Sequence, residues 1–450
     1  MFKLVTSITE KKVLENAAIV FFNISLFLSI IYFIIRFIDN IYFAKPNIGD
    51  EWFFYRDFSN YLIDGYYDSV LNGISIPLML ATKLIYSFTL DISSSLRLSN
   101  SVMVILMFIY LFKRNNLINE KDKHFFLFFL SLLIGTAGGM FYGTNDSFYS
   151  LGLLIILCES YLFHKDNTHS QLLLLLSFTL CILSRPHWVI NIPIILLCCM
   201  IINIIKNKWS VNLIYQPIII TFIASLVLAL SFNYPKLIEN NFSNNQNEYL
   251  PKFLFLSYAD KSNTYKTDDS DFNWIQWHYY SQMIASNKPY GFFSPMVDWD
   301  EVKLYKDLHG ESSLPKSYIQ YVLEYPIEVI KRVPIALLET SLMSIRYLGF
   351  FLFLLPLLIY LRYKERGLQI EALFIPIIVF LTILIFAILL PRMLDNRWFS
   401  PIYILTLIFI FDQSKYLKSV LKNNLLILNM FLMDIITIWA LWKWKIFLHI

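Results

Sequence analysis

The stretch AAIVFFNISLFLSIIYFIIRF, from Ala17 to Phe37, sets the fold class of this chain. About 20 apolar residues are what an α-helix needs to cross a hydrocarbon core of roughly 30 Å. The stretch is too long for the apolar part of a signal peptide and has no small-residue cleavage site. We therefore expect it to be retained as a first membrane span.

Similar apolar runs recur along the rest of the chain. Of 450 residues, 57% are hydrophobic and only 16% are charged, whereas a soluble domain carries about a quarter charged residues. The sequence therefore predicts an all-α polytopic membrane protein. About eleven transmembrane helices are expected, at 17–38, 98–112, 124–141, 147–163, 171–184, 187–205, 213–233, 335–361, 370–390, 398–412 and 424–442.

The segment from Ile74 to Leu90 decides the orientation of the chain. It is apolar but short and contains Pro77 and Lys83, which favours an interfacial or re-entrant helix. If it does not cross, the connections on the side of the N-terminus are rich in lysine, while the short opposite connections hold only Arg185, Arg392 and Arg397. The positive-inside rule then predicts a cytoplasmic N-terminus and an outward position for residue 50.

Three regions follow from this topology. Residues 1–233 form an N-terminal transmembrane module with an outward loop at 39–97, residues 234–334 form an outward, periplasmic insert, and residues 335–450 form the C-terminal helices. The aromatic patch WIQWHYY in the insert either binds a sugar face or rests at the lipid headgroups. The four cysteines all lie in apolar runs and are expected to be core residues.

Two classes of function are excluded by what the sequence lacks. There is no basic tail or stripe of the kind that binds nucleic acid. There is also no GxxxxGK[ST] loop, so work driven by nucleotide hydrolysis is not expected.

The acidic pair Asp50-Glu51 directly follows the first span and precedes a run of aromatic residues. The residues up to Gly65 form a broad apolar face and a polar face, which predicts a helix lying in the membrane interface. Two explanations of the acids stay open. Acids in a first turn complement the helix dipole, or a carboxylate at headgroup depth deprotonates an acceptor hydroxyl or binds a divalent cation.

Two further polar clusters are predicted on the same outward face. The sequence GTNDSF places Asn145 and Asp146 at the start of a span, where an N-cap is the ordinary explanation. The sequence LSRPHW places Arg185 and His187 in the turn between two short spans. There an arginine can simply extend toward the interface and a proline can begin a helix.

A third cluster, PRMLDNRWFSP, places Arg392, Asp395 and Arg397 in a tight outward turn, where a local ion pair is the ordinary explanation. Together, these clusters bring acids and arginines to one membrane face. Group transfer from a lipid phosphate needs a base near the attacking hydroxyl and cations for the departing phosphate. Arginine suits that role because its planar fork binds phosphate oxygens in a bidentate manner.

The order of these motifs resembles the GT-C superfamily of membrane glycosyltransferases, which includes the protein O-mannosyltransferases and the aminoarabinose lipid A transferases. The resemblance covers nearly the whole chain in the order and spacing of spans, and each motif is short. The matching residues are Gly49-Asp50-Glu51, Gly65-Tyr66-Tyr67, Arg97, Asn145-Asp146, Ser184-Arg185-Pro186, Tyr325-Pro326, Arg397-Trp398-Phe399 and Pro401.

The resemblance implies many helices around an outward-facing cavity, a polyprenyl-phosphate sugar donor and inversion at the anomeric carbon. It implies Asp50 as the catalytic base, Asp146 as the second acidic residue and Glu51 as the neighbour that orients the acceptor or a metal. We assign the donor phosphate to Arg97, Arg185, Arg392 and Arg397, and the acceptor to Arg56, Tyr66, Tyr67, His187, Trp274 and Trp277. No His, Asp and Glu cluster has the spacing of metal ligands, so dependence on a divalent metal stays open.

The expected partners are a polyprenyl-phosphate sugar donor, a glycan or glycolipid acceptor and membrane lipids. The expected location is the bacterial inner membrane, with the active site facing the periplasm. The size of the chain and its composition rich in Ile, Asn and Lys favour O-antigen or another envelope polysaccharide as the acceptor, although the composition indicates an AT-rich bacterium or phage more than a substrate.

Two other functions stay open. A flippase or transporter of lipid-linked sugars usually shows two related halves and charges near the midplane. Here the halves do not match, and the charges within apolar runs are few: Glu159, Glu339, Arg346 and Asp434. A polymerase of lipid-linked repeat units would use a large outward loop such as 233–334, whereas the early Asp50-Glu51 motif favours a single-sugar transferase.

Overall fold

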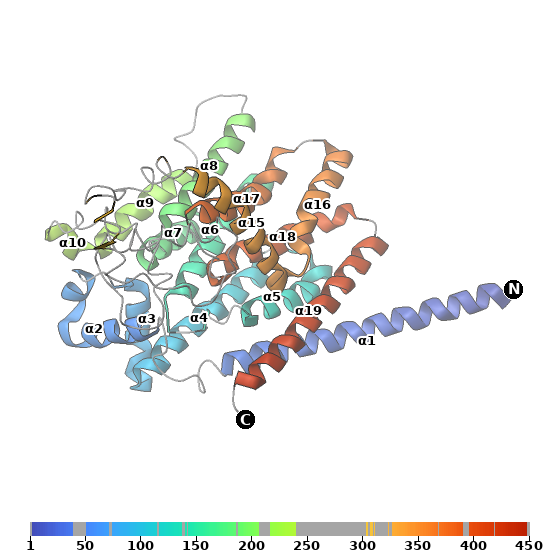
Figure 1. Ribbon diagram of the computed structural model, residues 1–450, viewed down its shortest axis with the longest axis horizontal. Helices are drawn as coiled ribbons and strands as arrows, with labels where there is room; N and C mark the ends of the chain where they lie inside the picture. The colour runs from blue at the N-terminus through green and yellow to red at the C-terminus, as the bar shows by residue number, and fades with distance from the viewer. Residues whose placement is uncertain are drawn as a thin grey trace. The chain divides into compact units, whose positions relative to one another are not determined.

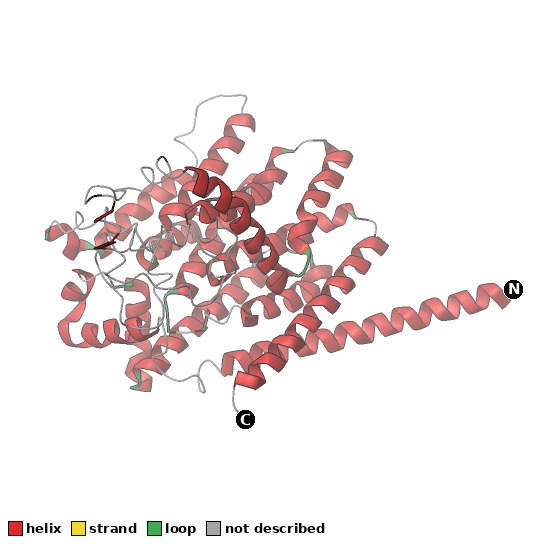
Figure 2. Ribbon diagram, viewed as in Figure 1, coloured by secondary structure: helices red, strands yellow, loops and turns green. Residues whose placement is uncertain are grey.

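The structure is a computed structural model, and it describes the larger part of the chain. The described ranges are 2–38, 51–71, 74–114, 117–136, 140–141, 143–185, 188–206, 217–239, 326–367, 369–389, 396–417 and 419–447, with the isolated positions 303–304, 307–308, 310 and 323. The regular elements of these ranges are helices (Figure 2).

The elements described in the first half of the chain are ten α-helices and one 3-10 helix, and Figure 1 labels the α-helices. They are α1 (Phe2–Ile38), α2 (Glu51–Leu71), α3 (Ile76–Thr89), α4 (Ile92–Lys113), the 3-10 helix η2 (Glu120–Asp122), α5 (Lys123–Thr136), α6 (Asp146–Asp166), α7 (Gln171–Ser184), α8 (Trp188–Lys206), α9 (Pro217–Phe232) and α10 (Tyr234–Ile238).

The second half continues with α15 (Pro326–Leu348), α16 (Phe351–Arg366), η5 (Ile370–Leu373), α17 (Phe374–Leu389), η6 (Asn396–Phe399), α18 (Ser400–Gln413), η7 (Ser414–Tyr416) and α19 (Ser419–Phe447). The chain divides into two compact units. The first comprises 1–234, 343–379 and 396–450, and the second comprises 235–342 and 380–395. All contacts described below lie within the first unit.

Six helices of the described residues are long and apolar enough to cross a membrane: Ala17–Ile38, Ile92–Lys113, Asp146–Asp166, Trp188–Lys206, Ile370–Ile388 and Leu421–Trp439. The number rises to seven if α15 and α16 form one broken span. The helices α3, α7 and α9 are apolar but have only 14, 14 and 16 residues. Even 16 residues rise only about 24 Å. The chain is thus a helical protein with the long apolar helices of a membrane-embedded one, and the count of eleven is not confirmed.

Helix α6 is the centre of the first unit. Every side chain from Asp146 to Leu162 is buried, because α6 packs against α4, α7, α8 and α18. The buried residues of α6 include polar side chains such as Asp146, Glu159 and Ser160. Hydrocarbon tails offer such groups no hydrogen-bond partner, so their enclosure by neighbouring helices keeps them out of lipid.

Helix α1 contrasts with α6. It packs against α5 and α19, beside which it runs in Figure 1, yet large apolar side chains such as Ile19 and Phe27 remain exposed. Exposed apolar side chains also occur on α4, α8 and α9. Such apolar surface is what hydrocarbon tails cover around a membrane-embedded bundle.

The range 335–361, predicted as one span, is divided by Gly349 and Phe350, so the prediction of a single helix is wrong. Gly349 has a φ of 59°, and a Cβ at this position would collide with Asn429 of α19. The buried Asn429 amide donates to Leu348 O at 2.9 Å and accepts from the Phe350 N–H at 2.9 Å. The break is stable because this side chain satisfies backbone groups that the helix leaves unpaired.

Helix α2 is interrupted at Gly65, whose φ of 80° and ψ of −171° are not helical. Its buried face presents Phe58 and Tyr61 to α3 and α4, where they join a cluster with Leu78 and Leu96. This packing places the start of α2 against the start of α4. The predicted end of the helix at Gly65 thus matches a real interruption of its helical geometry.

Cysteine accessibility tests the predicted orientation. The four native cysteines are buried and are replaced by alanine. In right-side-out vesicles, Asp64→Cys on α2 is expected to react with a membrane-impermeant maleimide, and Lys364→Cys on α16 only after permeabilisation. Labelling of both positions from the same side would contradict the orientation predicted from the lysine distribution.

Candidate functional site

The acidic residue Glu51 begins α2 and is 3% exposed. It forms a bidentate ion pair with Arg97 of α4, with distances of 2.7 Å from Nε to Oε1 and 2.8 Å from Nη2 to Oε2. Asp91 caps α4 by accepting from the Ser94 N–H at 2.7 Å, which places Arg97 in the second turn. A long-range ion pair therefore adds to any interaction of Glu51 with the helix dipole.

A second ion pair joins the start of α6 to the end of α7. Arg185 reaches Oδ1 of Asp146 at 2.7 Å and donates from Nε to Asn145 Oδ1 at 2.5 Å. The Asn145 amide also donates to Ser184 O at 2.5 Å, while Thr144 donates its hydroxyl to Asp146 at 2.9 Å. Asn145 occupies the N-cap position without a side-chain cap hydrogen bond. The predicted N-cap position is thus confirmed, but the Asn145 side chain ties α6 to α7 and does not cap the helix.

The two ion pairs are neighbours at the contact between α4 and α6. A Cβ on Gly143 would lie 2.7 Å from Oε1 of Glu51 and 2.8 Å from Cβ of Leu96, so only glycine fits beside this carboxylate. Ser147 next to Asp146 hydrogen-bonds to Asn100, which lies three residues after Arg97. We call the set Glu51, Arg97, Asn145, Asp146 and Arg185 the acid–arginine site.

The acid–arginine site balances its charge. It holds two carboxylates and two guanidinium groups, and exposures of the paired side chains are 4% and 3% for Arg97 and Glu51, and 11% and 3% for Arg185 and Asp146. Burying these groups requires each charge to have a partner, because an unpaired charge in a low-dielectric interior is very costly. The site is thus a rigid polar centre within an apolar bundle.

Three residues assigned to the acceptor lie on α2. Arg56 is exposed and pairs with Asp57 at 3.1 Å. Partial burial raises the pKa of Asp57 above its ordinary value, and Arg56 opposes that rise. Tyr66 donates its hydroxyl to Phe232 O at 2.6 Å, and both it and Tyr67 pack against the ring of Tyr234. The two tyrosines therefore hold α2 against the end of α9.

The other assigned residues lie outside what the structure describes. Asp50, His187, Trp274, Trp277 and Arg392 fall outside the described ranges, and Arg397 is described only by its backbone in η6. Their assignments remain predictions. Among the described residues there is no group of three or more His, Cys, Asp or Glu side chains that could hold a metal ion.

Comparisons of the chain with family models, with curated proteins and with solved structures find no match.

The sequence identified all five members of this site but not their pairing. It also missed Gly143, Asn100 and Ser147 as parts of the site. A signal was present in RLSNS at 97–101, where Arg97 and Asn100 are three residues apart and share a helix face. Polar residues on one face of an apolar helix indicate a polar partner on the next helix.

A double-mutant cycle tests the Glu51–Arg97 pair. Glu51→Gln and Arg97→Met each leave one buried charge without its partner, so each is expected to cost about 3–5 kcal/mol in unfolding free energy. The double variant should recover part of that loss because it leaves neither charge. The measurement is the thermal unfolding of purified protein in detergent, and additive losses would contradict a direct pair.

Proposed function

We propose that the chain is an inverting membrane glycosyltransferase of the GT-C type. It moves a sugar from a polyprenyl-phosphate donor to an outward-facing glycan or lipid, with O-antigen or another envelope polysaccharide as the acceptor. The proposal includes about eleven membrane-spanning helices and an active site on the periplasmic face of a bacterial inner membrane. The observation that carries it is the acid–arginine site, which gathers Glu51, Arg97, Asp146 and Arg185 from four separate segments.

The proposed base is Asp50, the residue before the buried Glu51. The acceptor hydroxyl oxygen attacks the anomeric carbon while its proton passes to the Asp50 carboxylate. The bond from the anomeric carbon to the phosphate oxygen breaks, and polyprenyl phosphate leaves from the opposite face with the electron pair. A single displacement of this kind inverts the anomeric carbon and needs no covalent sugar intermediate.

The buried ion pairs supply rigidity in this proposal. Glu51 held by Arg97 fixes the start of α2, and Asp50 is the residue that precedes Glu51 in the sequence. Arg185 is the more exposed guanidinium, at 11% against 4% for Arg97, and it is therefore the better placed to meet a donor phosphate. Arg392 and Arg397 are the further candidates for that phosphate. Preorganised donors of this kind stabilise the charge that develops on a leaving group.

The transport alternative is weakened by the partners of Glu159. This carboxylate is fully buried in α6 and accepts hydrogen bonds from Arg114 at 2.8 and 2.9 Å, from Tyr110 at 2.8 Å and from the Ser170 N–H at 2.7 Å. A carboxylate that carries a substrate or ion across the membrane must exchange partners. Glu159 is instead held by protein groups at the end of a helix.

The decisive variant is Asp50→Asn, which removes the base while keeping the size of the side chain. Loss of a general base costs about 10²- to 10⁴-fold in rate. The expected result is loss of the added sugar from the surface glycan, measured by mass spectrometry, with normal amounts of inserted protein. Asp64→Asn, at an exposed position on α2, is the matched control and should keep full activity.

Normal activity of Asp50→Asn would exclude Asp50 as the base. Incubation of purified protein with polyprenyl-phosphate glucose and an O-antigen acceptor separates the classes of function. A transferase releases polyprenyl phosphate, whereas a flippase does not.

A further inference from the structure

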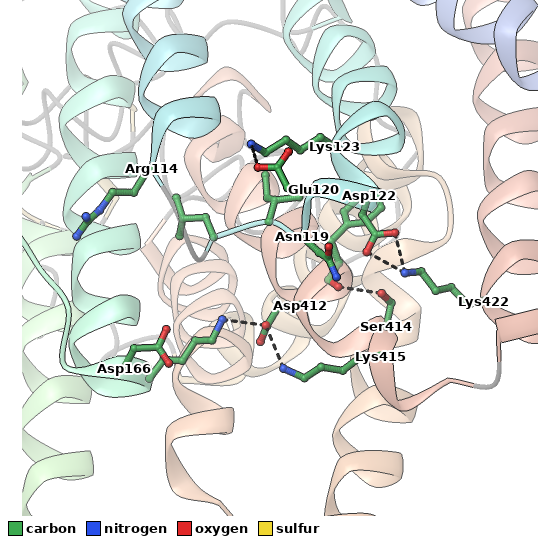
Figure 3. Close-up of a pocket in the computed structure, with 14 residues that line it drawn as sticks. Arg114, Asn119, Glu120, Asp122, Lys123, Asp166, Asp412, Ser414, Lys415 and Lys422 are labelled. Carbon is green, nitrogen blue, oxygen red and sulfur yellow. Dashed lines mark hydrogen bonds and ion pairs between the residues drawn. The ribbon is translucent and has the colours of Figure 1, made fainter.

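A second polar site lies at the other end of α6. A cavity of about 630 Å³ is bounded there by the ends of α4, α6 and α18, by the segment 117–123 and by the start of α19 (Figure 3). This volume is typical of small-molecule sites. Five cationic side chains line it: Arg114, Lys123, Lys165, Lys415 and Lys422. Four acids also line it: Glu120, Asp122, Asp166 and Asp412.

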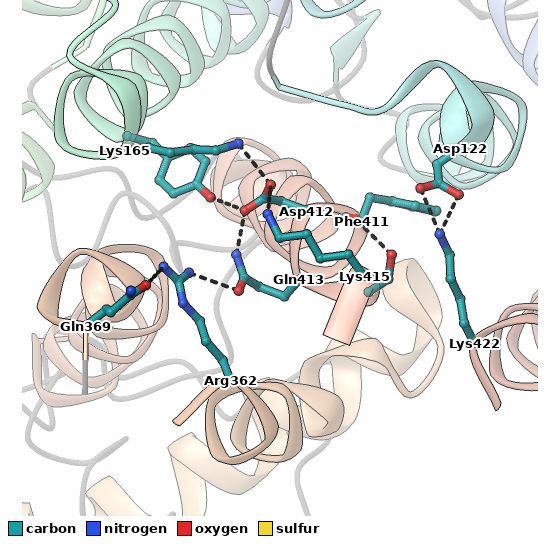
Figure 4. A network of polar contacts seen from close by, with 11 residues as sticks. Asp122, Lys165, Arg362, Gln369, Phe411, Asp412, Gln413, Lys415 and Lys422 are labelled. Atoms are coloured by element: carbon teal, nitrogen blue, oxygen red, sulfur yellow. Dashed lines mark hydrogen bonds and ion pairs between the residues drawn. The ribbon is translucent and has the colours of Figure 1, made fainter. Parts of the chain in front are cut away.

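Three of these acids are already bound by lysines. Asp412 accepts from Lys165 at 2.9 Å and from Lys415 at 3.3 Å through one oxygen, and from Tyr161 at 2.6 Å through the other (Figure 4). Lys422 reaches both oxygens of Asp122 at 2.7 and 2.8 Å. Glu120 accepts from Lys123 at 2.6 Å. The carboxylate oxygens are thus largely used within the protein.

The lysines carry more N–H donors than the carboxylates of the cavity accept. Each ammonium group has three N–H donors, and two ammonium groups share the single carboxylate of Asp412. Lys415 is the most exposed of these lysines, with 52% of its side chain accessible beside 25% for Lys123, 23% for Lys165 and 20% for Lys422. A ligand that enters the cavity therefore meets N–H donors and a positively charged region around Lys415.

The position of the cavity also favours a ligand that contains a phosphate group. Its lining residues come from connections that the lysine distribution predicts to be cytoplasmic. Anionic lipids give that leaflet a negative surface, and basic pockets between transmembrane helices on that side bind phosphate-containing headgroups. Charge-assisted hydrogen bonds from lysine and arginine to phosphate are the strong contacts available to such a group.

We propose that this cavity binds a phosphate group, carried either by an anionic lipid headgroup or by a soluble phosphate. Lys415 makes the main contact, and Lys123 and Lys422 surround the group from the facing side of the cavity. Asp412 acts as the anchor that holds Lys165 and Lys415 together. The proposal concerns the other end of α6 from the acid–arginine site and does not depend on the glycosyltransferase assignment.

The test uses the full chain in nanodiscs. Nanodiscs of mixed phosphatidylcholine and phosphatidylglycerol are analysed by native mass spectrometry for the lipid that stays bound. In a separate arm, inorganic phosphate is added to nanodiscs of phosphatidylcholine alone, and the thermal unfolding midpoint is measured. Preferential retention of phosphatidylglycerol identifies a lipid headgroup, whereas a rise of the midpoint with inorganic phosphate identifies a soluble phosphate.

Lys415→Gln removes the main contact and leaves Asp412 paired with Lys165, so the variant keeps its folding contacts. It should weaken binding about fivefold, the effect of one lysine near an anionic group, and Lys415→Arg should keep it. Lys364→Gln, at an exposed lysine of α16 that does not line the cavity, is the matched control. Absence of both ligand responses, or an equal effect of Lys364→Gln, would overturn the proposal.

Discussion

The pairing of buried charges on α6 is the interaction on which the first unit depends. Asp146 and Glu159 lie thirteen residues apart on a helix enclosed by its neighbours, about 20 Å at 1.5 Å per residue. Each carboxylate is met by an arginine from another segment, Arg185 for Asp146 and Arg114 for Glu159. Because an unpaired buried charge costs several kcal/mol, α6 cannot slide or rotate without losing both pairs. The neighbouring helices are therefore fixed to α6 at both of its ends.

This constraint places a polar site at each end of one apolar helix. At the N-terminal end, Asp146 and Asn145 join α7 through Arg185, while Glu51 and Arg97 join α2 to α4 beside them. At the C-terminal end, Lys165 extends from α6 to Asp412 of α18. The two sites differ in character. The first is closed and balanced in charge, which suits the positioning of a base, and the second surrounds an open cavity rich in ammonium groups.

Some polar residues were identified from the sequence, but the partners of their side chains were not. Asn145 stands where an N-cap is expected, and its amide instead bonds to Ser184 and Arg185. Arg185 was expected either to extend toward the interface or to meet a phosphate; it pairs with Asp146, and its role toward a phosphate stays a prediction. Gly349 lies within an apolar run that was predicted as one span, and the break at this residue was not predicted. The signal for the break lies eighty residues away in Asn429, which no local pattern reveals.

The amino-acid sequence by itself determined the helical class, the apolar segments and the interruption at Gly65, because hydropathy and glycine conformation are properties of short stretches. It also identified Glu51, Arg97, Asp146 and Arg185 as polar residues next to apolar runs. Only the tertiary structure decided their partners, because Glu51 and Arg97 are separated by 46 residues in the chain. Lysines 165, 415 and 422 likewise looked like ordinary cytoplasmic charges until the packing of α6, α18 and α19 gathered them around one cavity. Local composition sets which residues must leave water, whereas the choice of partner for a buried charge is made by the packing of distant helices.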